Sequence, residues 1–195
     1  FDQERPPVED APAWAHPDAP SILQTVSRAT SSQVSGPGIL PQVRPMLPVM
    51  NGDYSHWLET NVRRQKQAGY CLVTATIPLG DFTGQQMRIL GDLATAFADG
   101  TIRVTAEQDL VFRWVRADAV PELYRQLSAA GLGLPDAGTI ADVTSCPGAE
   151  SCKLAVTQSR GLGKYLGDYL RERPDLIDAA PDLQIKISGC PNGCG

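Results

Sequence analysis

Four cysteines near the end of the chain form two pairs, and this arrangement constrains the rest of the sequence most strongly. Cys146 and Cys152 are separated by five residues, Cys190 and Cys194 by three, and 37 residues lie between the pairs. Each pair is set among Gly and Pro residues. In a chain without a visible secretory signal, cysteines are more typical of metal ligands than of a disulfide framework. The sequence therefore predicts one site with four thiolate ligands.

The spacing of the cysteines favours one kind of metal centre but leaves others open. Zinc usually takes cysteine pairs two to four residues apart, so the five-residue spacing of the first pair is unusual for zinc. A [4Fe–4S] cluster is larger and is held by four cysteines that can be distant in the chain. An iron–sulfur cluster is the favoured interpretation, and a structural zinc or an unrelated arrangement remains an alternative.

Composition excludes several classes of protein. The net charge is −5, and the basic residues are scattered, so nucleic-acid binding has no support. No run of 18 apolar residues and no signal peptide is visible, which predicts a cytoplasmic protein without a membrane span. The chain begins with Phe1 rather than Met and ends one residue after Cys194, so we expect a fragment of a longer protein.

Residues 54–134 show alternating helix and strand signals. The β-branched, alternating run at 70–77 predicts a strand, and Thr83 with Gln86 forms a capping box at the start of a helix that Gly100 ends. Two strands, at 101–105 and 110–115, precede a helix that Asp118 is expected to cap, with Pro121 in its first turn. A short helix or turn is expected at 54–68, and a further strand at 139–144.

This order of elements, β-α-β-β-α-β, predicts a ferredoxin-like module of the α+β class with an antiparallel sheet. Residues 1–50 contain nine of the 16 prolines, which prevents long helices and predicts a Pro-rich linker. We expect the module over residues 51–138, followed over residues 139–195 by the start of an α/β domain that holds the metal. Cys71 is expected to be a buried strand residue, and His56 a surface residue or one with a hydrogen-bond partner, not a ligand.

Two expectations concern the chain between the cysteine pairs. A helix starting directly after Cys152 would place this thiol at a helix N-terminus, where amide dipoles stabilise a thiolate. Gly161, Gly163 and Gly167 interrupt the following helical pattern. They indicate either close packing against this backbone or a break between two short helices. A short strand at 183–187 is expected to lead to Cys190.

The two cysteine segments, Thr144–Leu154 and Ser188–Gly195, resemble the cluster signatures of the siroheme-dependent nitrite/sulfite reductases. Both cysteine spacings match this family. Upstream, Asn61–Tyr70 and Ile102–Leu110 resemble its ferredoxin-like module, in the copy found in the second half of these proteins. The resemblance covers roughly residues 54–195, and the paired cysteine signature is its specific part.

The resemblance implies a role for each cysteine. Cys146, Cys152, Cys190 and Cys194 would ligate a [4Fe–4S] cluster, and Cys194 would also be the axial ligand of the siroheme iron. Gly189 and Gly193 would let the backbone approach the macrocycle, with Asn192 in a left-handed turn. Basic residues close to the ligands are candidates to bind the siroheme carboxylates, namely Lys153, Arg160, Lys164 and Lys186.

The activity implied is six-electron reduction of sulfite to sulfide or of nitrite to ammonia, with ferredoxin or a reductase subunit as electron donor. The basic residues that neutralise the anion belong mainly to the first half of the family's proteins, so we expect no catalytic residue in this chain and no activity from it alone. The precorrin synthase of cobalamin biosynthesis, which has the cluster but no siroheme, is an alternative, and a non-catalytic domain with a structural zinc or a simple electron-transfer cluster is another. The precorrin synthase carries Ala-Lys-Gly between its second pair of cysteines, where this chain has Pro191-Asn192-Gly193, which favours the reductases.

Overall fold

The computed structural model describes residues 53–195, so the linker predicted over residues 1–50 lies outside the described residues. The helices and strands follow in this order: α2 (Asp53–Asn61), β1 (Val62–Arg64), β2 (Tyr70–Ala75), α3 (Gly84–Phe97), β3 (Ile102–Val104), β4 (Leu110–Arg116), α4 (Val120–Ala129), β5 (Thr144–Ser145), α5 (Ser159–Arg171), α6 (Pro174–Ala179) and β6 (Lys186–Ile187). Three short 3₁₀ turns join some of them, namely η2 (Pro78–Gly80), η3 (Ala117–Ala119) and η4 (Gly148–Glu150).

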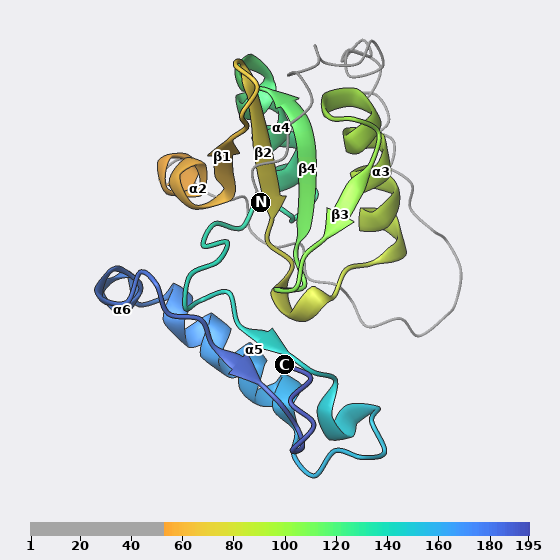
Figure 1. Ribbon diagram of the computed structural model, residues 1–195, viewed down its shortest axis with the longest axis vertical. Coiled ribbons are helices and arrows are strands. Elements are labelled where there is room, and N and C mark those ends of the chain that lie inside the picture. Colours follow the sequence, from red (N-terminus) through yellow and green to blue (C-terminus); the bar gives the residue numbers. More distant parts are fainter. Residues whose placement is uncertain (1–52) are drawn as a thin grey trace, which may run out of the picture.

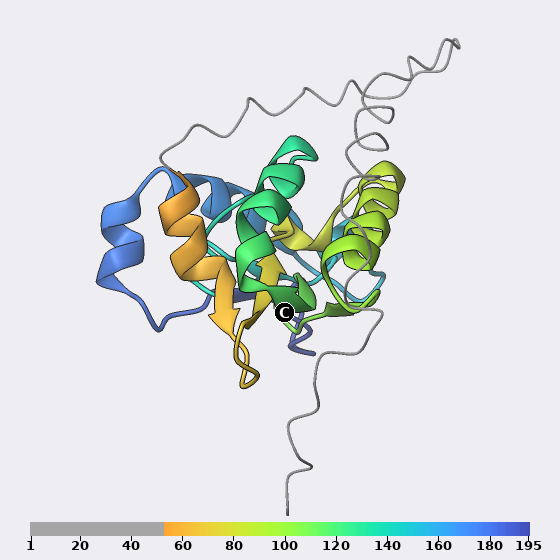
Figure 2. The ribbon, with the colours of Figure 1, turned by 90° about the horizontal axis from the view of Figure 1, so that it is seen from above.

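Four strands form one antiparallel sheet in the order β1-β2-β4-β3. Helix α3 connects β2 to β3 across the intervening β4, which is the split β-α-β arrangement of ferredoxin-like folds. Helices α3 and α4 cover the same face of the sheet (Figures 1 and 2). The predicted α+β class and ferredoxin-like module are therefore confirmed.

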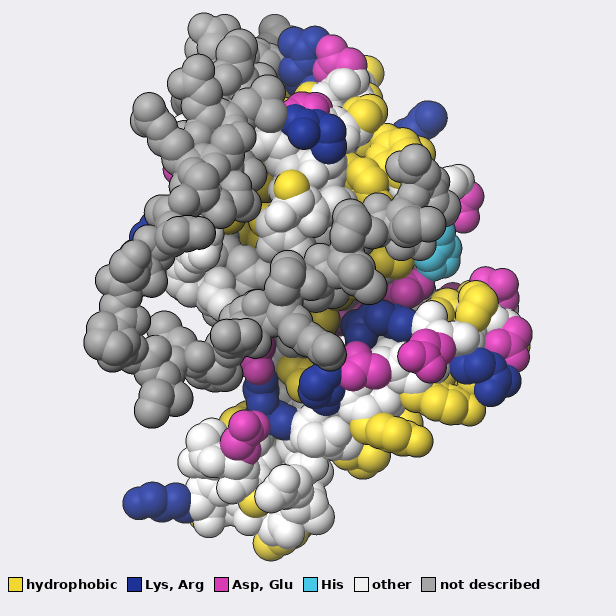
Figure 3. Space-filling view, turned by 180° about the vertical axis from the view of Figure 1, so that it is seen from behind, with side chains coloured by type: hydrophobic (Ala, Val, Ile, Leu, Met, Phe, Trp, Pro, Cys, Tyr) yellow, Lys and Arg dark blue, Asp and Glu magenta, His cyan; other side chains and the backbone are white. Residues whose placement is uncertain are grey.

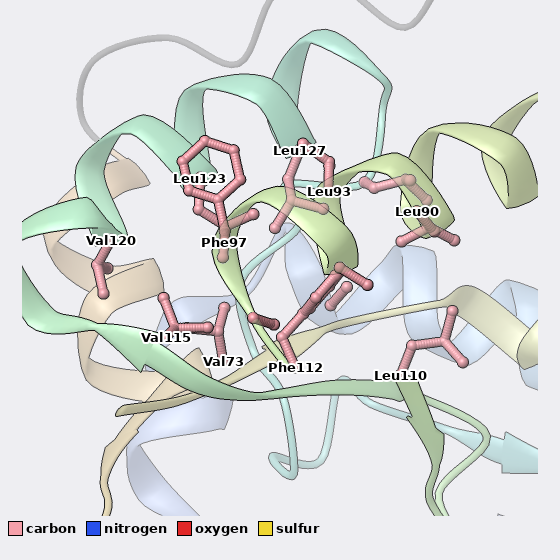
Figure 4. Packing of buried hydrophobic residues seen from close by; sticks show 14 of the residues in the cluster. Val73, Leu90, Leu93, Phe97, Leu110, Phe112, Val115, Val120, Leu123 and Leu127 are labelled. Atoms are coloured by element: carbon pink, nitrogen blue, oxygen red, sulfur yellow. The ribbon is translucent and has the colours of Figure 1, made fainter. Parts of the chain in front are cut away.

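The core of this module lies between the sheet and its two helices. In β2, buried and half-exposed residues alternate along the strand, because successive side chains point to opposite faces. The buried side chains of β2 and β4 point toward an apolar stripe from α3 and α4 (Figure 4). Cys71 belongs to this core and is 7% exposed, as expected for a buried strand cysteine.

Two N-terminal caps were predicted, one for α3 and one for α4, and the structure has only the first. The Thr83 hydroxyl accepts a hydrogen bond from the Gln86 amide, and the Gln86 side chain accepts one from the Thr83 amide, so the capping box is confirmed. Asp118 does not cap α4: it lies in η3, the N-cap residue is Ala119, and no side chain caps this helix. The Asp118 carboxylate instead binds the exposed guanidinium of Arg116, which competes for it two residues away.

The helix predicted near residue 54 is α2, which packs beside the sheet. Trp57 is fully buried there, and its ring centroid lies 4.6 Å from that of Tyr124 in α4. His56 Nε2 lies 2.6 Å from an Asp136 carboxylate oxygen, so its ring has a partner, as predicted.

The position of one strand differs from the prediction. No strand spans 139–144: β5 covers only Thr144–Ser145 and pairs in parallel with β6, outside the main sheet. The place beside β2 is taken by β1, whose three residues directly follow α2 and return through a short hairpin. A hairpin partner close in sequence closes a shorter loop than residues 139–144 would.

Residues from β5 onward form a second body below the module in Figure 1. Helix α5 packs against α6 and the β5–β6 pair around a small apolar cluster of its own. None of the helices in the described part of the chain has the length and apolar character needed to cross a bilayer. The division into domains at residue 138 stays a prediction.

Candidate metal centre

The parallel pairing of β5 and β6 brings the two cysteine segments together. Thr144 lies opposite Lys186 and Ser145 opposite Ile187, and the Cys146 amide donates to the Ile187 carbonyl at 3.1 Å. Parallel strands end at the same edge, so the loop that starts at Cys146 and the loop that leads to Cys190 leave the pair side by side. The short strand predicted to deliver Cys190 is thus present, though it covers only residues 186–187.

The two loops are in close contact at Gly189. Its carbonyl accepts hydrogen bonds from the amides of Val156 at 2.8 Å and Thr157 at 3.2 Å. A Cβ atom at this position would lie 3.0 Å from the Cα of Gly148 and 3.2 Å from the Cβ of Ala155. Gly189 therefore lets the two cysteine loops approach each other closely, and its approach to a macrocycle stays a prediction.

The Cys146 thiol lies where the two loops meet and is 6% exposed. Its sulfur accepts a hydrogen bond from the Gly189 amide at 3.1 Å and lies 3.3 Å from the Ser159 hydroxyl oxygen. The hydrogen bond with Ser159, followed by that from Gly189, lowers the pKa of the thiol because both favour the thiolate. Donors that favour a thiolate suit a metal ligand, since a metal binds the deprotonated form.

The other three cysteines are nearer the surface. Cys152 and Cys190 are half-exposed and Cys194 is exposed, and none of the five cysteines forms a disulfide. Among the side chains of residues 53–195, no group of three or more His, Cys, Asp or Glu is arranged to hold a metal ion. The backbone therefore brings the two loops together, while the four sulfurs do not converge on a single point.

The donor set nevertheless fits the predicted cluster in its chemistry. Four thiols on two adjoining loops are the soft ligands that iron–sulfur clusters use. A backbone N–H aimed at the Cys146 sulfur is the kind of hydrogen bond that tunes such clusters. The assignment of the four cysteines as ligands stays a prediction.

Two local expectations around the cysteines are wrong. Residues 152–158 are not helical, and α5 starts only at Ser159, so Cys152 does not lie at a helix N-terminus. The chain there is held by loop contacts, including the Val156 and Thr157 amides on the Gly189 carbonyl. In the last loop, the residue in the left-handed region is Gly193, at φ +64°, and not Asn192.

The basic residues near the cysteines lie in different surroundings. Lys153 and Lys186 are exposed, and Lys164 pairs with Asp168 at 2.7 Å. The Arg160 guanidinium binds Asp81 and lies 3.1 Å from a Glu150 carboxylate oxygen, so it ties η2 to η4. On the face in Figure 3, basic and acidic side chains are interspersed. Whether Lys153, Arg160 or Lys186 contacts a siroheme carboxylate stays a prediction.

The three glycines of α5 differ in how closely other parts of the chain approach them. The helix runs unbroken over Ser159–Arg171, which excludes a break between two short helices. A Cβ at Gly163 would lie 2.9 Å from Leu79 Cδ2 and 3.1 Å from Ser145 Cβ, and one at Gly167 would lie 3.5 Å from the Ala141 carbonyl oxygen. Gly161 has nothing within 4 Å of its added Cβ. Close packing of α5 on η2 and β5 therefore explains Gly163, whereas the added Cβ at Gly167 meets only Arg171 of the same helix, at 3.3 Å, and the Ala141 carbonyl.

Replacing Gly163 with Ala is expected to destabilise the protein by about 1–3 kcal/mol, because the methyl group overpacks this contact. Gly161→Ala is the matched control and is expected to stabilise the protein by up to about 1 kcal/mol through helix propensity alone. Urea denaturation followed by circular dichroism measures both changes. Equal effects of the two substitutions would contradict the packing role of Gly163.

Two side chains that link the module to the cysteine segment were not predicted from the sequence. Gln108 and Asp109 lie between the two predicted strands at 101–105 and 110–115, and they contact the segment 142–145. Burial, followed by the charge of nearby Asp142, raises the pKa of Asp109 to about 8. Burial also raises the pKa of Asp142, and the two carboxyls are hydrogen-bonded to each other. Such contacts could not be predicted from the sequence, because acidic and amide side chains at a turn are usually exposed to solvent and no local pattern marks the ones that are not.

Part of this chain is similar to a described protein family. Residues 63–130 match the family described as the nitrite/sulfite reductase ferredoxin-like half domain. The ferredoxin–nitrite reductase of Synechococcus elongatus is 27% identical over 134 residues, which cover 69% of this chain and 26% of that protein. Sulfite reductase [ferredoxin] 1 of Mycolicibacterium paratuberculosis is 31% identical over 117 residues, covering 59% of this chain and 21% of that protein.

Solved structures agree with the sequence matches. The NirA protein of Mycobacterium tuberculosis superposes with a TM-score of 0.57 at 30% identity, over 69% of this chain and 25% of that one. A dissimilatory sulfite reductase I structure shares the fold, with a TM-score of 0.52 at 18% identity. The chain spans about a quarter of the length of the relatives it matches. Residues 63–130 are therefore a ferredoxin-like half domain of the nitrite/sulfite reductase type.

Proposed function

We propose that this chain is the cluster-binding part of a siroheme-dependent nitrite or sulfite reductase. In this proposal Cys146, Cys152, Cys190 and Cys194 hold a [4Fe–4S] cluster, and Cys194 also ligates the siroheme iron. The observation that carries the proposal is the β5–β6 pair, which sets the two cysteine loops side by side with the Gly189 amide on the Cys146 sulfur.

In this proposal the residues of this chain hold the cofactors and shield the Cys146 sulfur from water. The siroheme and cluster, when bound, would supply the iron that binds the anion and would pass on electrons from an external donor, one at a time, for six-electron reduction of nitrite to ammonia or of sulfite to sulfide. The Gly189 amide and the Ser159 hydroxyl stabilise the Cys146 thiolate, and the burial of Cys146 keeps water from its sulfur. The surface cysteines, Cys152, Cys190 and Cys194, remain accessible for the cofactor.

The electron donor in this proposal is ferredoxin or a reductase subunit, in the cytoplasm. Its support is that several relatives are named as ferredoxin-dependent reductases. The anion-binding basic residues would lie outside this chain, so we expect the 195-residue chain to show no turnover of sulfite or nitrite by itself.

Anaerobic reconstitution with iron and sulfide tests the proposal. We expect about four iron atoms and four labile sulfide ions per chain. The visible absorption spectrum is expected to be that of a [4Fe–4S] cluster. One zinc and no iron in the purified protein would overturn it in favour of a structural zinc site. The absorption bands of siroheme in the full-length protein separate the alternatives, because a cluster without these bands would favour an enzyme of the precorrin synthase kind.

A further inference from the structure

The turn between β3 and β4 reaches from the ferredoxin-like module to the strand that precedes Cys146. The Gln108 side-chain Nε2 donates to the Ser145 carbonyl at 2.9 Å, and its Oε1 accepts from the Ser145 amide at 3.3 Å. Ser145 is fully buried and immediately precedes Cys146. One side chain thus satisfies both backbone groups of the residue next to a predicted cluster ligand.

The two edges of β5 explain why this contact matters. On one edge, the amides of Thr144 and Cys146 donate to the carbonyls of Ile185 and Ile187. The amide and carbonyl of Ser145, between them, point to the opposite edge because hydrogen-bonding groups alternate along a strand. There the Gln108 amide takes the place of a neighbouring strand, so β5 is held from both sides.

The backbone that carries Gln108 is itself rigid. The Thr105 amide donates to the Asp109 carbonyl at 2.9 Å, and the Thr105 hydroxyl accepts from the amides of Glu107 and Asp109, both at 3.2 Å. Gln108 lies in the left-handed region at φ +73°. On its other side, a Cβ at Gly80 would come within 3.2 Å of the Gln108 Cβ, so η2 packs tightly on this side chain.

We propose that Gln108 is a positioning residue for the cluster: it fixes Ser145, and through it the Cys146 ligand, against the ferredoxin-like module. The inference rests on the proposed function, since it takes Cys146 as a ligand. The adjacent residue supports it, because Asp109 accepts from the Ile77 amide at 2.8 Å and hydrogen-bonds Asp142, three residues before Ser145. Two neighbouring side chains of one turn therefore hold the segment that leads to Cys146.

Gln108→Gly removes the side chain and suits the positive φ, so the turn is expected to keep its shape. In this variant of the 195-residue chain, amide hydrogen exchange at Ser145 and Cys146 is expected to speed up roughly tenfold, since the segment loses one edge of its hydrogen bonding. After reconstitution, we expect a changed electron paramagnetic resonance spectrum of the reduced cluster and faster cluster loss than in the unsubstituted chain.

A second variant and a matched control separate positioning from loss of stability. Gln108→Glu keeps the acceptor for the Ser145 amide but not the donor to its carbonyl, and intermediate values are expected. Gln65→Ala removes a similar contact, in which the Gln65 Oε1 accepts from the Trp114 amide at 2.7 Å, far from the cysteine loops. Exchange at Ser145 and the cluster spectrum are expected to be unchanged in this control.

Each outcome decides a different claim. Unchanged exchange at Ser145 and Cys146 in Gln108→Gly would overturn the inference, whatever the cluster does. Faster exchange with an unchanged spectrum and rate of cluster loss would also overturn it, because the ligand would not depend on Gln108. If the unsubstituted chain takes up no iron, the proposed function fails and the ligand role with it, while hydrogen exchange still measures whether Gln108 holds the segment.

Discussion

Replacing Cys146 with Ala is expected to abolish cluster assembly, whereas replacing Cys71 with Ala is expected to leave it intact. Cys146 is the buried thiol at the junction of the two loops, and its sulfur accepts a hydrogen bond from the Gly189 amide, which favours the thiolate. A [4Fe–4S] cluster needs a ligand for each of its irons, so losing the best-shielded one exposes it to water and oxygen. Iron and labile sulfide per chain after anaerobic reconstitution measure the effect.

Cys71 is a matched control because it is a cysteine of similar burial in another environment. It is 7% exposed, in the core of the ferredoxin-like module, where burial raises the pKa of its thiol. Cys71→Ala is expected to cost about 1 kcal/mol of stability by loss of packing, with iron content unchanged. Full iron content in Cys146→Ala, or its loss in Cys71→Ala, would contradict the assignment of ligands.

The free energy of unfolding is expected to fall as the pH rises from about 4 to about 8, because of the Asp109–Asp142 pair. In the unfolded chain, Asp109 loses its proton near its ordinary pKa of 3.8. In the folded protein, burial and the neighbouring Asp142 carboxylate raise its pKa to about 8. Between these values the folded state binds more protons, so stability decreases with pH and levels off above about 8. One pKa unit corresponds to about 1.4 kcal/mol, and we expect a fall larger than this.

Asp142→Asn tests the cause of this pH dependence. The asparagine oxygen keeps the acceptor for the Gly138 amide, which lies 2.7 Å from the carboxylate, and its amide group donates to the Asp109 carboxylate. Glu107 and Arg171 also act on the pair: the charge of Glu107 raises the pKa of both carboxyls, and that of Arg171 lowers the pKa of Asp142. The variant is expected to equal the unsubstituted protein at about pH 4 and to be more stable by over about 1 kcal/mol at pH 8.

Urea denaturation at several pH values, followed by circular dichroism, measures the effect. Asp178→Asn is the control, because Asp178 is an exposed aspartate of α6 and its charge faces water. The control is expected to keep the pH profile of the unsubstituted protein. A profile that stays unchanged in Asp142→Asn would show that the carboxyl pair does not set the pH dependence.

Several features of the fold were predictable from short stretches of sequence. The capping box of Thr83 and Gln86, the alternation in β2 and Pro121 in the first turn of α4 are local signals, and the structure has each of them. The cap predicted at Asp118 failed because an arginine two residues away offers the carboxylate a stronger, bidentate partner. The strand expected at 139–144 failed because strand signals do not say which sheet a segment joins.

The sequence by itself determined the ferredoxin-like class, the family resemblance and the identity of the four candidate ligands, because periodicity, caps and cysteine spacing are encoded over a few residues. Only the tertiary structure showed that β5 and β6 pair and that other parts of the chain pack closely on Gly189 and Gly163. It also showed that the side chains of Gln108 and Asp109 contact the segment before Cys146. These contacts join residues distant in the chain, and their formation depends on how the two bodies pack, which no local pattern records.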